Sequence, residues 1–199
     1  MVFDMIIILG LTGSIAMGKT TTANLFRQQG IPVFDADATV HALYEGKAVS
    51  VLKDHFPEAI HNNRVERHLL ASAIAGDEAK LIMLESLIHP LVFEEKHIFL
   101  HQCRKKGFHL AVLDIPLLFE TGEDQNCHAV AVVSAPESVQ RERVLARPGM
   151  NEQKLALLLH HQISDRDKRK RAHFLIETGR GFEAAEKQVK DIIRCFAGR

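Results

Sequence analysis

The chain contains Gly13-Ser14-Ile15-Ala16-Met17-Gly18-Lys19-Thr20, which matches the phosphate-binding pattern G-x-x-x-x-G-K-[ST]. An apolar run at 5–9 precedes this loop, and a helical pattern over 21–29 follows it. Glycines let the backbone wrap with its N–H groups pointing inward, and the helix adds a partially positive N-terminus. A glycine-rich turn before an ordinary helix is the alternative interpretation. It requires the strand, the loop and the helix to coincide by accident.

Two side chains add chemistry to the backbone of the loop. The Lys19 ammonium can reach the β- and γ-phosphates of a nucleotide, and the Thr20 hydroxyl can be offered to Mg²⁺. The sequence therefore predicts that ATP and Mg²⁺ bind here. The residues expected to contact the nucleotide are Gly13, Ser14, Ile15, Ala16, Met17, Gly18, Lys19, Thr20 and Thr21.

Length and composition narrow the class of protein. The 199 residues are 46% apolar, which suits one α/β domain with a small inserted subdomain. The formal net charge is zero, so no chain-wide field favours nucleic acid or a membrane surface. No stretch reaches the ~20 apolar residues of a membrane span, and the short apolar N-terminal run lacks the features of a signal peptide. Three widely spaced cysteines indicate free thiols in a reducing compartment. We expect a cytoplasmic protein, with a monomer favoured.

Short aliphatic segments alternate with helical patterns along the chain. Strands are expected at 5–9, 32–34, 110–113, 129–133 and 174–176, each without strict alternation, as strands buried on both faces should be. The sequence therefore predicts a P-loop NTPase-type α/β fold, with a parallel five-stranded sheet sandwiched by helices.

The interval 38–106 holds more helix than a crossover between parallel strands needs. Helices are expected at 38–44, 48–55, 67–75, 78–87 and 91–105. We interpret 38–106 as a helical insertion at the carboxyl edge of the sheet, and 1–37 with 107–199 as the core. A merely decorative flap is the alternative.

A basic region over about 140–171 is the second unusual segment. Arg143 and Arg147 are four residues apart and are expected on one helical face, beside a break at Pro148 and Gly149. Guanidinium groups that fold over a triphosphate neutralise its charge, so a closing lid is preferred to a solvated face. The cluster from Lys168 to Arg171 fits lid contacts and plain solvation equally well.

Acidic residues follow two of the expected strands. Asp114 ends one strand where a magnesium-binding acid is found in phosphate-loop proteins, although an Asp that caps the next turn is the alternative. Asp35 and Asp37, two residues apart in extended chain, are expected to project to the same side. One can accept a proton from a substrate hydroxyl, while the other fixes a backbone or Mg²⁺–water contact. Asp37 can also cap a helix that begins near Ala38.

These parts together favour a small-metabolite kinase. The Asn-Lys-x-Asp guanine reader of a regulatory GTPase is absent from the sequence. Phosphoryl transfer to an alcohol requires alignment, charge neutralisation and exclusion of water, which an acid pair, an insertion and a lid supply. A nucleotide sensor or RNA-associated module that uses the basic cluster is the alternative class. The balanced charge and the lack of tryptophan count against it.

Several segments, in order along nearly the whole chain, resemble the dephospho-CoA kinase family. They are Leu11-Thr12-Gly13, Phe34-Asp35-Ala36-Asp37, Glu66-Arg67-x-x-Leu70, Leu84-Glu85-x-x-x-His89-Pro90, Asp114-Ile115-Pro116-Leu117-Leu118-Phe119-Glu120 and Gln140-x-x-Arg143-x-x-x-Arg147. The resemblance implies ATP-dependent phosphorylation of the ribose 3′-hydroxyl of dephospho-CoA, the last step of coenzyme A synthesis. It also implies that 38–106 binds CoA and that a lid lies within about 140–171.

The resemblance assigns roles to individual residues. It implies that Asp37 is the general base, that Lys19 binds phosphate and that Arg143 and Arg147 are lid arginines. The residues expected to bind the acceptor substrate are Asp35, Arg67, His89, Pro116, Leu117, Leu118, Phe119 and Glu120. The residues expected to bind the metal are Thr20 and Asp114. Ala16 and Met17 replace small residues common in the family, so both are expected in conformations that a side chain tolerates. His41 stands where the family often has arginine.

Overall fold

The computed structural model describes residues 6–160 and 162–197, which form two compact units. The first unit comprises the described residues up to Phe34 and from Cys103 onward, and the second comprises Asp35–Gln102. These boundaries lie a few residues before the expected ones. The first unit carries the phosphate-binding loop, and the second carries the helical insertion.

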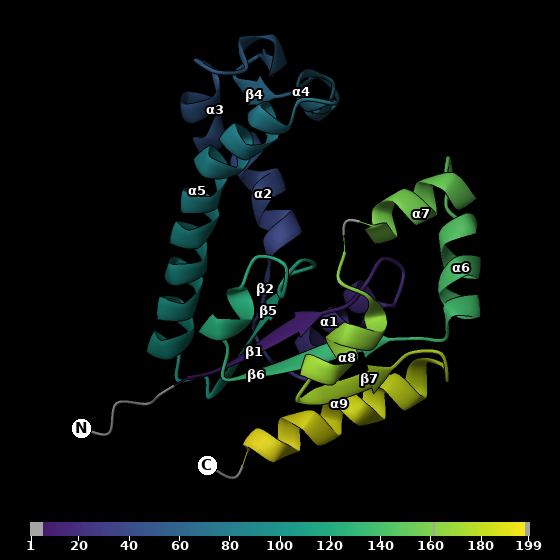
Figure 1. Ribbon diagram of the computed structural model, residues 1–199. Helices are drawn as coiled ribbons and strands as arrows, with labels where there is room; N and C mark the ends of the chain where they lie inside the picture. Colours follow the sequence, from purple (N-terminus) through teal and green to yellow (C-terminus); the bar gives the residue numbers. More distant parts are fainter. Residues whose placement is uncertain (1–5, 161, 198–199) are drawn as a thin grey trace. The chain divides into compact units, whose positions relative to one another are not determined.

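The first unit is built on one five-stranded sheet (Figure 1). Its strands are β1 (Ile7–Thr12), β2 (Val33–Asp35), β5 (Leu110–Asp114), β6 (Ala129–Ser134) and β7 (Phe174–Glu177). Their order is β2-β5-β1-β6-β7, and β1 pairs in parallel with both β5 and β6, as β6 does with β7. The predicted α/β class and the parallel five-stranded sheet are therefore confirmed. Residue 5, where the first strand was expected to begin, lies outside the described residues.

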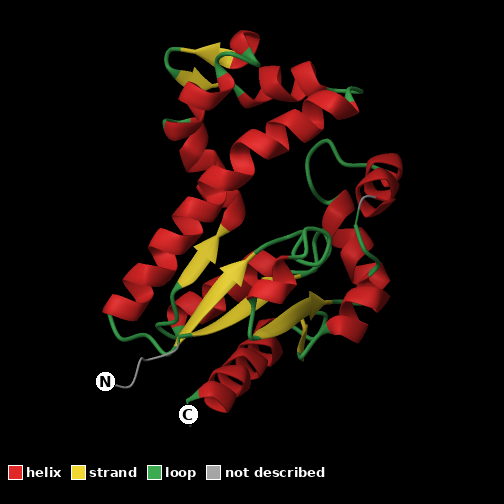
Figure 2. Ribbon diagram, turned by 60° about the vertical axis from the view of Figure 1, so that its left-hand side comes forward, coloured by secondary structure: helices red, strands yellow, loops and turns green. Residues whose placement is uncertain are grey.

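Both faces of this sheet are covered, which explains why its strands lack strict alternation. On one face, Leu9 and Leu11 of β1 pack in a core with α1 (Lys19–Gln28) and α9 (Phe182–Phe196). On the other face, Val130 and Val132 of β6 pack with the turn after β5, while α8 (Asp165–Arg171) crosses β6. Figure 2 shows the strands enclosed between helices. Successive side chains of one strand, such as β6, therefore pack alternately in the apolar core on one face of the sheet and in the core on the other face.

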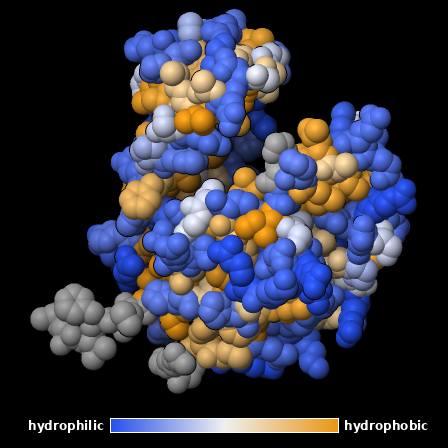
Figure 3. Space-filling model, viewed as in Figure 1, coloured by the Kyte–Doolittle hydropathy of each residue, from blue (hydrophilic) through white to orange (hydrophobic). Residues whose placement is uncertain are grey.

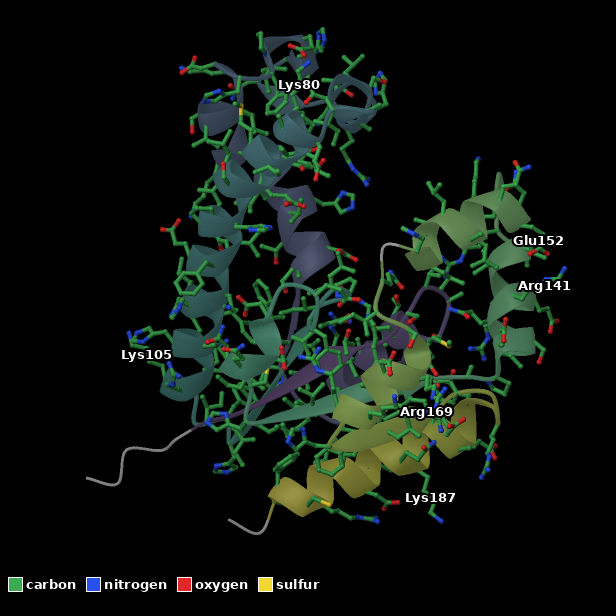
Figure 4. All side chains as sticks on the ribbon, viewed as in Figure 1. Lys80, Lys105, Arg141, Glu152, Arg169 and Lys187 are labelled. Atoms are coloured by element: carbon green, nitrogen blue, oxygen red, sulfur yellow. The ribbon has the colours of Figure 1, made fainter. Side chains whose placement is uncertain are left out.

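Two helices, α6 (Glu137–Leu145) and α7 (Glu152–His160), extend from the first unit and form what we call the arm, residues 137–160 (Figure 1). An ion pair between Arg141 of α6 and Glu152 of α7 joins them (Figure 4). Leu157 of α7 is 65% exposed, and Figure 3 shows apolar surface over this helix. The helix α7 thus exposes apolar side chains at the surface of the arm.

The second unit is mostly helical (Figure 2). Its elements are α2 (Ala36–Tyr44), α3 (Lys47–Leu52), a 3₁₀ turn (Pro57–Ala59), β3 (Ile60–His61), β4 (Arg64–Val65), α4 (Arg67–Ile74) and α5 (Glu78–Lys105), the last of which continues into the first unit. A core that includes Leu52, Phe56 and Leu84 holds these elements together. The unit therefore has a hydrophobic core of its own.

Two details of the second unit differ from expectation. The interval was expected to be almost wholly helical, but β3 and β4 form a small antiparallel hairpin. Asn62 and Asn63, both at positive φ, make the two-residue turn that such a hairpin requires. The two helices expected at 78–87 and 91–105 are one continuous helix, with Pro90 inside it. Proline removes one helical hydrogen bond, and the bonds on either side maintain the helix.

Within the described residues, no helix is both long and apolar enough to span a membrane.

Candidate active site

The backbone carbonyl groups of Ile15, Ala16 and Met17 in the phosphate-binding loop accept hydrogen bonds from side chains elsewhere in the protein. The Thr178 hydroxyl donates to the Met17 carbonyl at 2.6 Å. The Arg143 guanidinium donates to the Ala16 carbonyl at 3.4 Å and to Thr178 at 2.9 and 3.0 Å. Because α1 begins at Lys19, its first N–H groups have no intrahelical acceptor. The loop therefore presents backbone donors, as an anion site requires.

Close packing explains both glycines of the motif. A Cβ at Gly13 would lie 2.5 Å from the Val133 carbonyl oxygen of β6. Gly18 has φ +95°, and a Cβ there would lie 3.1 Å from the Thr178 hydroxyl oxygen. Neither position accepts a larger residue without displacing backbone or the Thr178 contact.

Ala16 does not adopt the conformation expected of it. Its φ is 59°, in the left-handed region that alanine rarely occupies. The expectation that Ala16 adopts a conformation a side chain tolerates is wrong, because a positive φ is strained for alanine. Met17 avoids strain differently, since its side chain is buried and its sulfur accepts a hydrogen bond from the Ala135 N–H.

Lys19 and Asp114 form an ion pair, with 2.6 Å between the Lys19 ammonium nitrogen and one carboxylate oxygen. The parallel register places Asp114 opposite Leu11, two residues before the loop. The Asp114 side chain is only 2% exposed, whereas Thr20 at the start of α1 is exposed. A hydroxyl and a carboxylate are hard oxygen donors of the kind that Mg²⁺ prefers, so these two residues suit the expected metal.

The expected pair of lid arginines is not on one helical face. The helix α6 ends at Leu145, so Arg147 lies in the turn beyond it and is exposed. Arg143 is half-buried, and its guanidinium is bonded to Ala16 and Thr178. Arg143 thus connects the phosphate-binding loop to the segment after β7, while Arg147 lies at the surface.

The cations of the basic cluster from Lys168 to Arg171 are paired with carboxylates. The buried Lys168 ammonium lies 2.9 Å from a carboxylate oxygen of Glu120 and donates to the Pro116 carbonyl at 3.3 Å. The other three cations also pair with carboxylates, Arg169 with Glu177, Lys170 with Asp167, and Arg171 with Asp124. Lys168 is therefore not a solvated side chain, whereas the other three are exposed at the surface and paired there.

The segment from Pro116 to Glu120 serves mainly to hold this region together. Leu118 and Phe119 are buried in the core on one face of the sheet. One Glu120 oxygen accepts from Lys168 and from the Ile163 N–H, and the other is buried without a partner among the described residues. Leu117 is exposed. Only the first part of this segment is therefore accessible to a ligand.

The acid pair has a different geometry from the one expected. Asp35 is the N-cap of α2, and its carboxylate accepts from the Ala38 N–H at 3.0 Å. Asp37 lies in the first turn of α2 and is exposed. The two residues therefore do not project from one extended strand, and the cap is Asp35 rather than Asp37.

A pocket of about 460 Å³ lies within the second unit, and Asp37 is part of its lining. Its other lining residues are Val40, His41, Tyr44, Arg67, Leu70, Ala71, Ile74 and Leu84. Burial raises the pKa of the Tyr44 phenol, and the Arg67 guanidinium offsets part of that rise. The pocket combines one carboxylate and two basic side chains with an apolar wall, which suits an organic anion that carries a hydroxyl.

Asp37 and Arg67 of this pocket were predicted from the sequence as site residues, whereas Tyr44 was not. His89 was expected on the acceptor side, but it does not line the pocket and is exposed on α5. The spacing of Asp37, His41 and Tyr44 gave a usable signal, because residues three and four apart share a helix face. Among the described residues, no group of three metal-binding side chains is present.

A phosphate-binding loop after the central strand of a parallel sheet, with an acid at the end of the neighbouring strand, defines the core of a P-loop kinase. A model of the dephospho-CoA kinase family matches residues 7–183. The chain belongs to the dephospho-CoA kinase family, whose members are phosphotransferases that catalyse the final step of coenzyme A synthesis.

Individual relatives agree with this assignment. The dephospho-CoA kinase of Mesorhizobium japonicum is 50% identical over 193 residues, which cover 97% of this chain and 98% of that protein. A crystal structure from Thermus thermophilus is 32% identical with a TM-score of 0.84, covering 98% of this chain and 99% of that one. The shikimate kinase of Acinetobacter baumannii is 20% identical with a TM-score of 0.54 and covers 97% of this chain and 94% of that one. This last likeness shows the fold alone.

We expect Ala16→Gly to leave the free energy of unfolding unchanged or raise it by up to about 1 kcal/mol. Glycine removes about 1–2 kcal/mol of left-handed strain, and the greater freedom of the unfolded chain offsets part of that gain. The measurement is urea denaturation. The matched control is Ala156→Gly in the exposed interior of α7, where the same change should cost about 1 kcal/mol. Equal losses at the two positions would contradict the strain argument.

We expect Lys168→Met to lower the free energy of unfolding by about 3–5 kcal/mol, because it leaves the Glu120 carboxylate largely buried without its cation. The double variant Lys168→Met with Glu120→Gln should recover much of the loss, since a neutral amide still accepts from Ile163. Urea denaturation measures both. Lys170→Met, in the same helix but in an exposed pair, is the control and should change stability far less. Similar losses of stability for Lys168→Met and Lys170→Met would contradict the conclusion that the buried Lys168–Glu120 pair stabilises the fold.

Proposed function

We propose that this chain transfers the γ-phosphoryl group of ATP to the ribose 3′-hydroxyl of dephospho-CoA, which gives coenzyme A and ADP. The observation that carries the proposal is a phosphate-binding loop with its lysine and acid in place, in a chain that belongs to this family. The pocket of the second unit supports it, since its basic groups suit an acceptor that is itself a phosphate ester. We also propose that the enzyme acts in the cytoplasm.

Charge neutralisation at the donor end is assigned to the first unit. The N–H groups at the start of α1 bind phosphate oxygens, and the Lys19 ammonium binds the β- and γ-phosphates. Thr20 and Asp114 are the residues that would hold Mg²⁺, which supplies further neutralisation of the transferring group when it is bound. The Lys19–Asp114 ion pair keeps both side chains at the phosphate-binding loop.

Acceptor activation is assigned to Asp37. A carboxylate that accepts the proton of the 3′-hydroxyl raises the electron density on that oxygen as it bonds to phosphorus, while the bond to ADP breaks. Asp37 is exposed and lines the pocket, so it is accessible to a bound acceptor. Arg67 and His41 supply basic groups for the acceptor's anionic part. Asp35 supports Asp37 by capping the helix that carries both Asp37 and His41.

The arm is assigned the role of lid. Arg147 is exposed in the turn after α6, so its guanidinium is accessible to a phosphate ligand. Arg143 acts closer to the sheet, where it fixes the loop through Ala16 and Thr178. In this division of roles one arginine shapes the site and the other is supplied by the arm.

The reaction is tested with purified protein, ATP, Mg²⁺ and dephospho-CoA, with product formation followed by chromatography. Formation of coenzyme A and ADP in equal amounts is expected. A panel of other alcohols and nucleosides in place of dephospho-CoA tests for a different acceptor. Turnover with another member of the panel and none with dephospho-CoA would overturn the proposed substrate.

We expect Asp37→Asn to lower kcat by roughly 10²–10⁴-fold, as loss of a general base usually does. The control is Asp54→Asn, which makes the same change at an exposed aspartate of the second unit that does not line the pocket. Steady-state kinetics of both variants, with circular dichroism to confirm folding, measure the difference. A folded Asp37→Asn enzyme with near-normal kcat would show that another group takes the proton.

A further inference from the structure

One residue of the phosphate-binding loop is bonded on both sides by glutamines. The Ile15 carbonyl accepts a hydrogen bond from the Gln140 amide nitrogen at 2.8 Å. The Ile15 N–H donates to the Gln162 amide oxygen at 3.3 Å. A carbonyl only accepts and an N–H only donates, so these partners fix the orientation of both amides.

Gln140 lies near the start of the arm, and Gln162 lies just beyond its end. Gln140 is in α6 near the start of the arm, and its side chain is buried. Gln162 follows α7, and the next residue, Ile163, donates its N–H to Glu120 at 2.9 Å. Both ends of the arm are therefore tied to Ile15, and the second end is also tied to the turn after β5.

We infer that Gln140 and Gln162 are positioning residues that couple the arm to the phosphate-binding loop through Ile15. A fixed Ile15 peptide group holds the neighbouring N–H groups in the direction that a nucleotide phosphate needs. An arm that moves away from the loop must break at least one of these two bonds. Binding of nucleotide to the loop and placement of the arm thus favour each other. The inference rests on the proposed use of the loop for ATP.

The opposite roles of the two amides provide a sharp test, because the same substitution should act differently at the two positions. Gln→Glu keeps an acceptor oxygen for the Ile15 N–H at 162 but removes the donor for the Ile15 carbonyl at 140. Gln→Met removes both functions without adding charge. Gln153→Glu, on the exposed surface of α7, is the control for the added charge.

Two measurements are made on the full chain. Amide hydrogen exchange at Ile15 in the nucleotide-free protein reports the Gln162 bond directly. Calorimetry with a non-hydrolysable ATP analogue and Mg²⁺ gives Kd for the nucleotide, and steady-state kinetics give KM for dephospho-CoA. Residues with a merely structural role would change both values when substituted. A change in Kd for the nucleotide without a change in KM for dephospho-CoA therefore separates positioning of the loop from general damage to the fold.

We expect Gln140→Glu and Gln140→Met each to weaken binding of the ATP analogue by roughly tenfold, with KM for dephospho-CoA little changed, because an unmet buried carbonyl is costly. Gln162→Met should speed exchange of the Ile15 amide, and Gln162→Glu should restore its protection. Gln153→Glu should behave as wild type in both measurements. If Gln140→Glu does not fold, Gln140→Met carries the same comparison.

The inference is overturned if the Gln140 variants bind the analogue as tightly as Gln153→Glu does, or if Gln162→Met leaves Ile15 exchange unchanged. A wild-type protein that neither binds the analogue nor turns over would instead refute the proposed function. The exchange measurement does not depend on nucleotide, so the two failures are distinguishable.

Discussion

The site depends on one constraint: the carbonyl groups at 15–17 of the phosphate-binding loop must be bonded to the protein so that the N–H groups at the start of α1 remain for a ligand. Side chains more than a hundred residues away in sequence meet this constraint, since Gln140, Arg143 and Thr178 each donate to a loop carbonyl. A backbone turn with unpaired carbonyls would adopt other conformations. The anion site is therefore a product of the whole first unit rather than of the eight-residue motif alone.

The sheet brings these distant donors together. Thr178 directly follows β7, which pairs with β6, and β6 pairs with β1 ahead of the loop. Gln140 and Arg143 come from the helix that follows β6. Because parallel strands end at the same edge, the connections after β6 and β7 both supply side chains to the loop after β1. The strand order thus explains why residues so far apart in sequence share one task.

Much of this arrangement was predictable, and the reason is physical. The five strands have short aliphatic sequences that fit only a sheet buried on both faces, and the loop motif fixes the position of β1 among them. Local conformation was harder to predict. The helix α2 begins at Ala36 rather than near Ala38, which makes Asp35 the cap and leaves Asp37 free to line a pocket. Which of the two aspartates caps the helix, and which is the candidate base, depends on where α2 begins. A shift of one or two residues in that start exchanges the two roles, and helix ends are the part of a structure that sequence patterns predict least well.

Charge partners were the least predictable part, because pairing depends on tertiary structure. The run from Lys168 to Arg171 looks like a basic patch in sequence, yet its cations pair with Glu120, Glu177, Asp167 and Asp124 within the first unit. The same helix thus stabilises the fold around the site instead of presenting charge to a ligand. Neutralisation of the phosphate charge then depends on other cations, Lys19 at the end of the loop motif and Arg147, which is exposed after α6. A kinase gains from this division, since a strong field from unpaired cations would attract any polyanion, whereas a few positioned cations select a ligand by geometry.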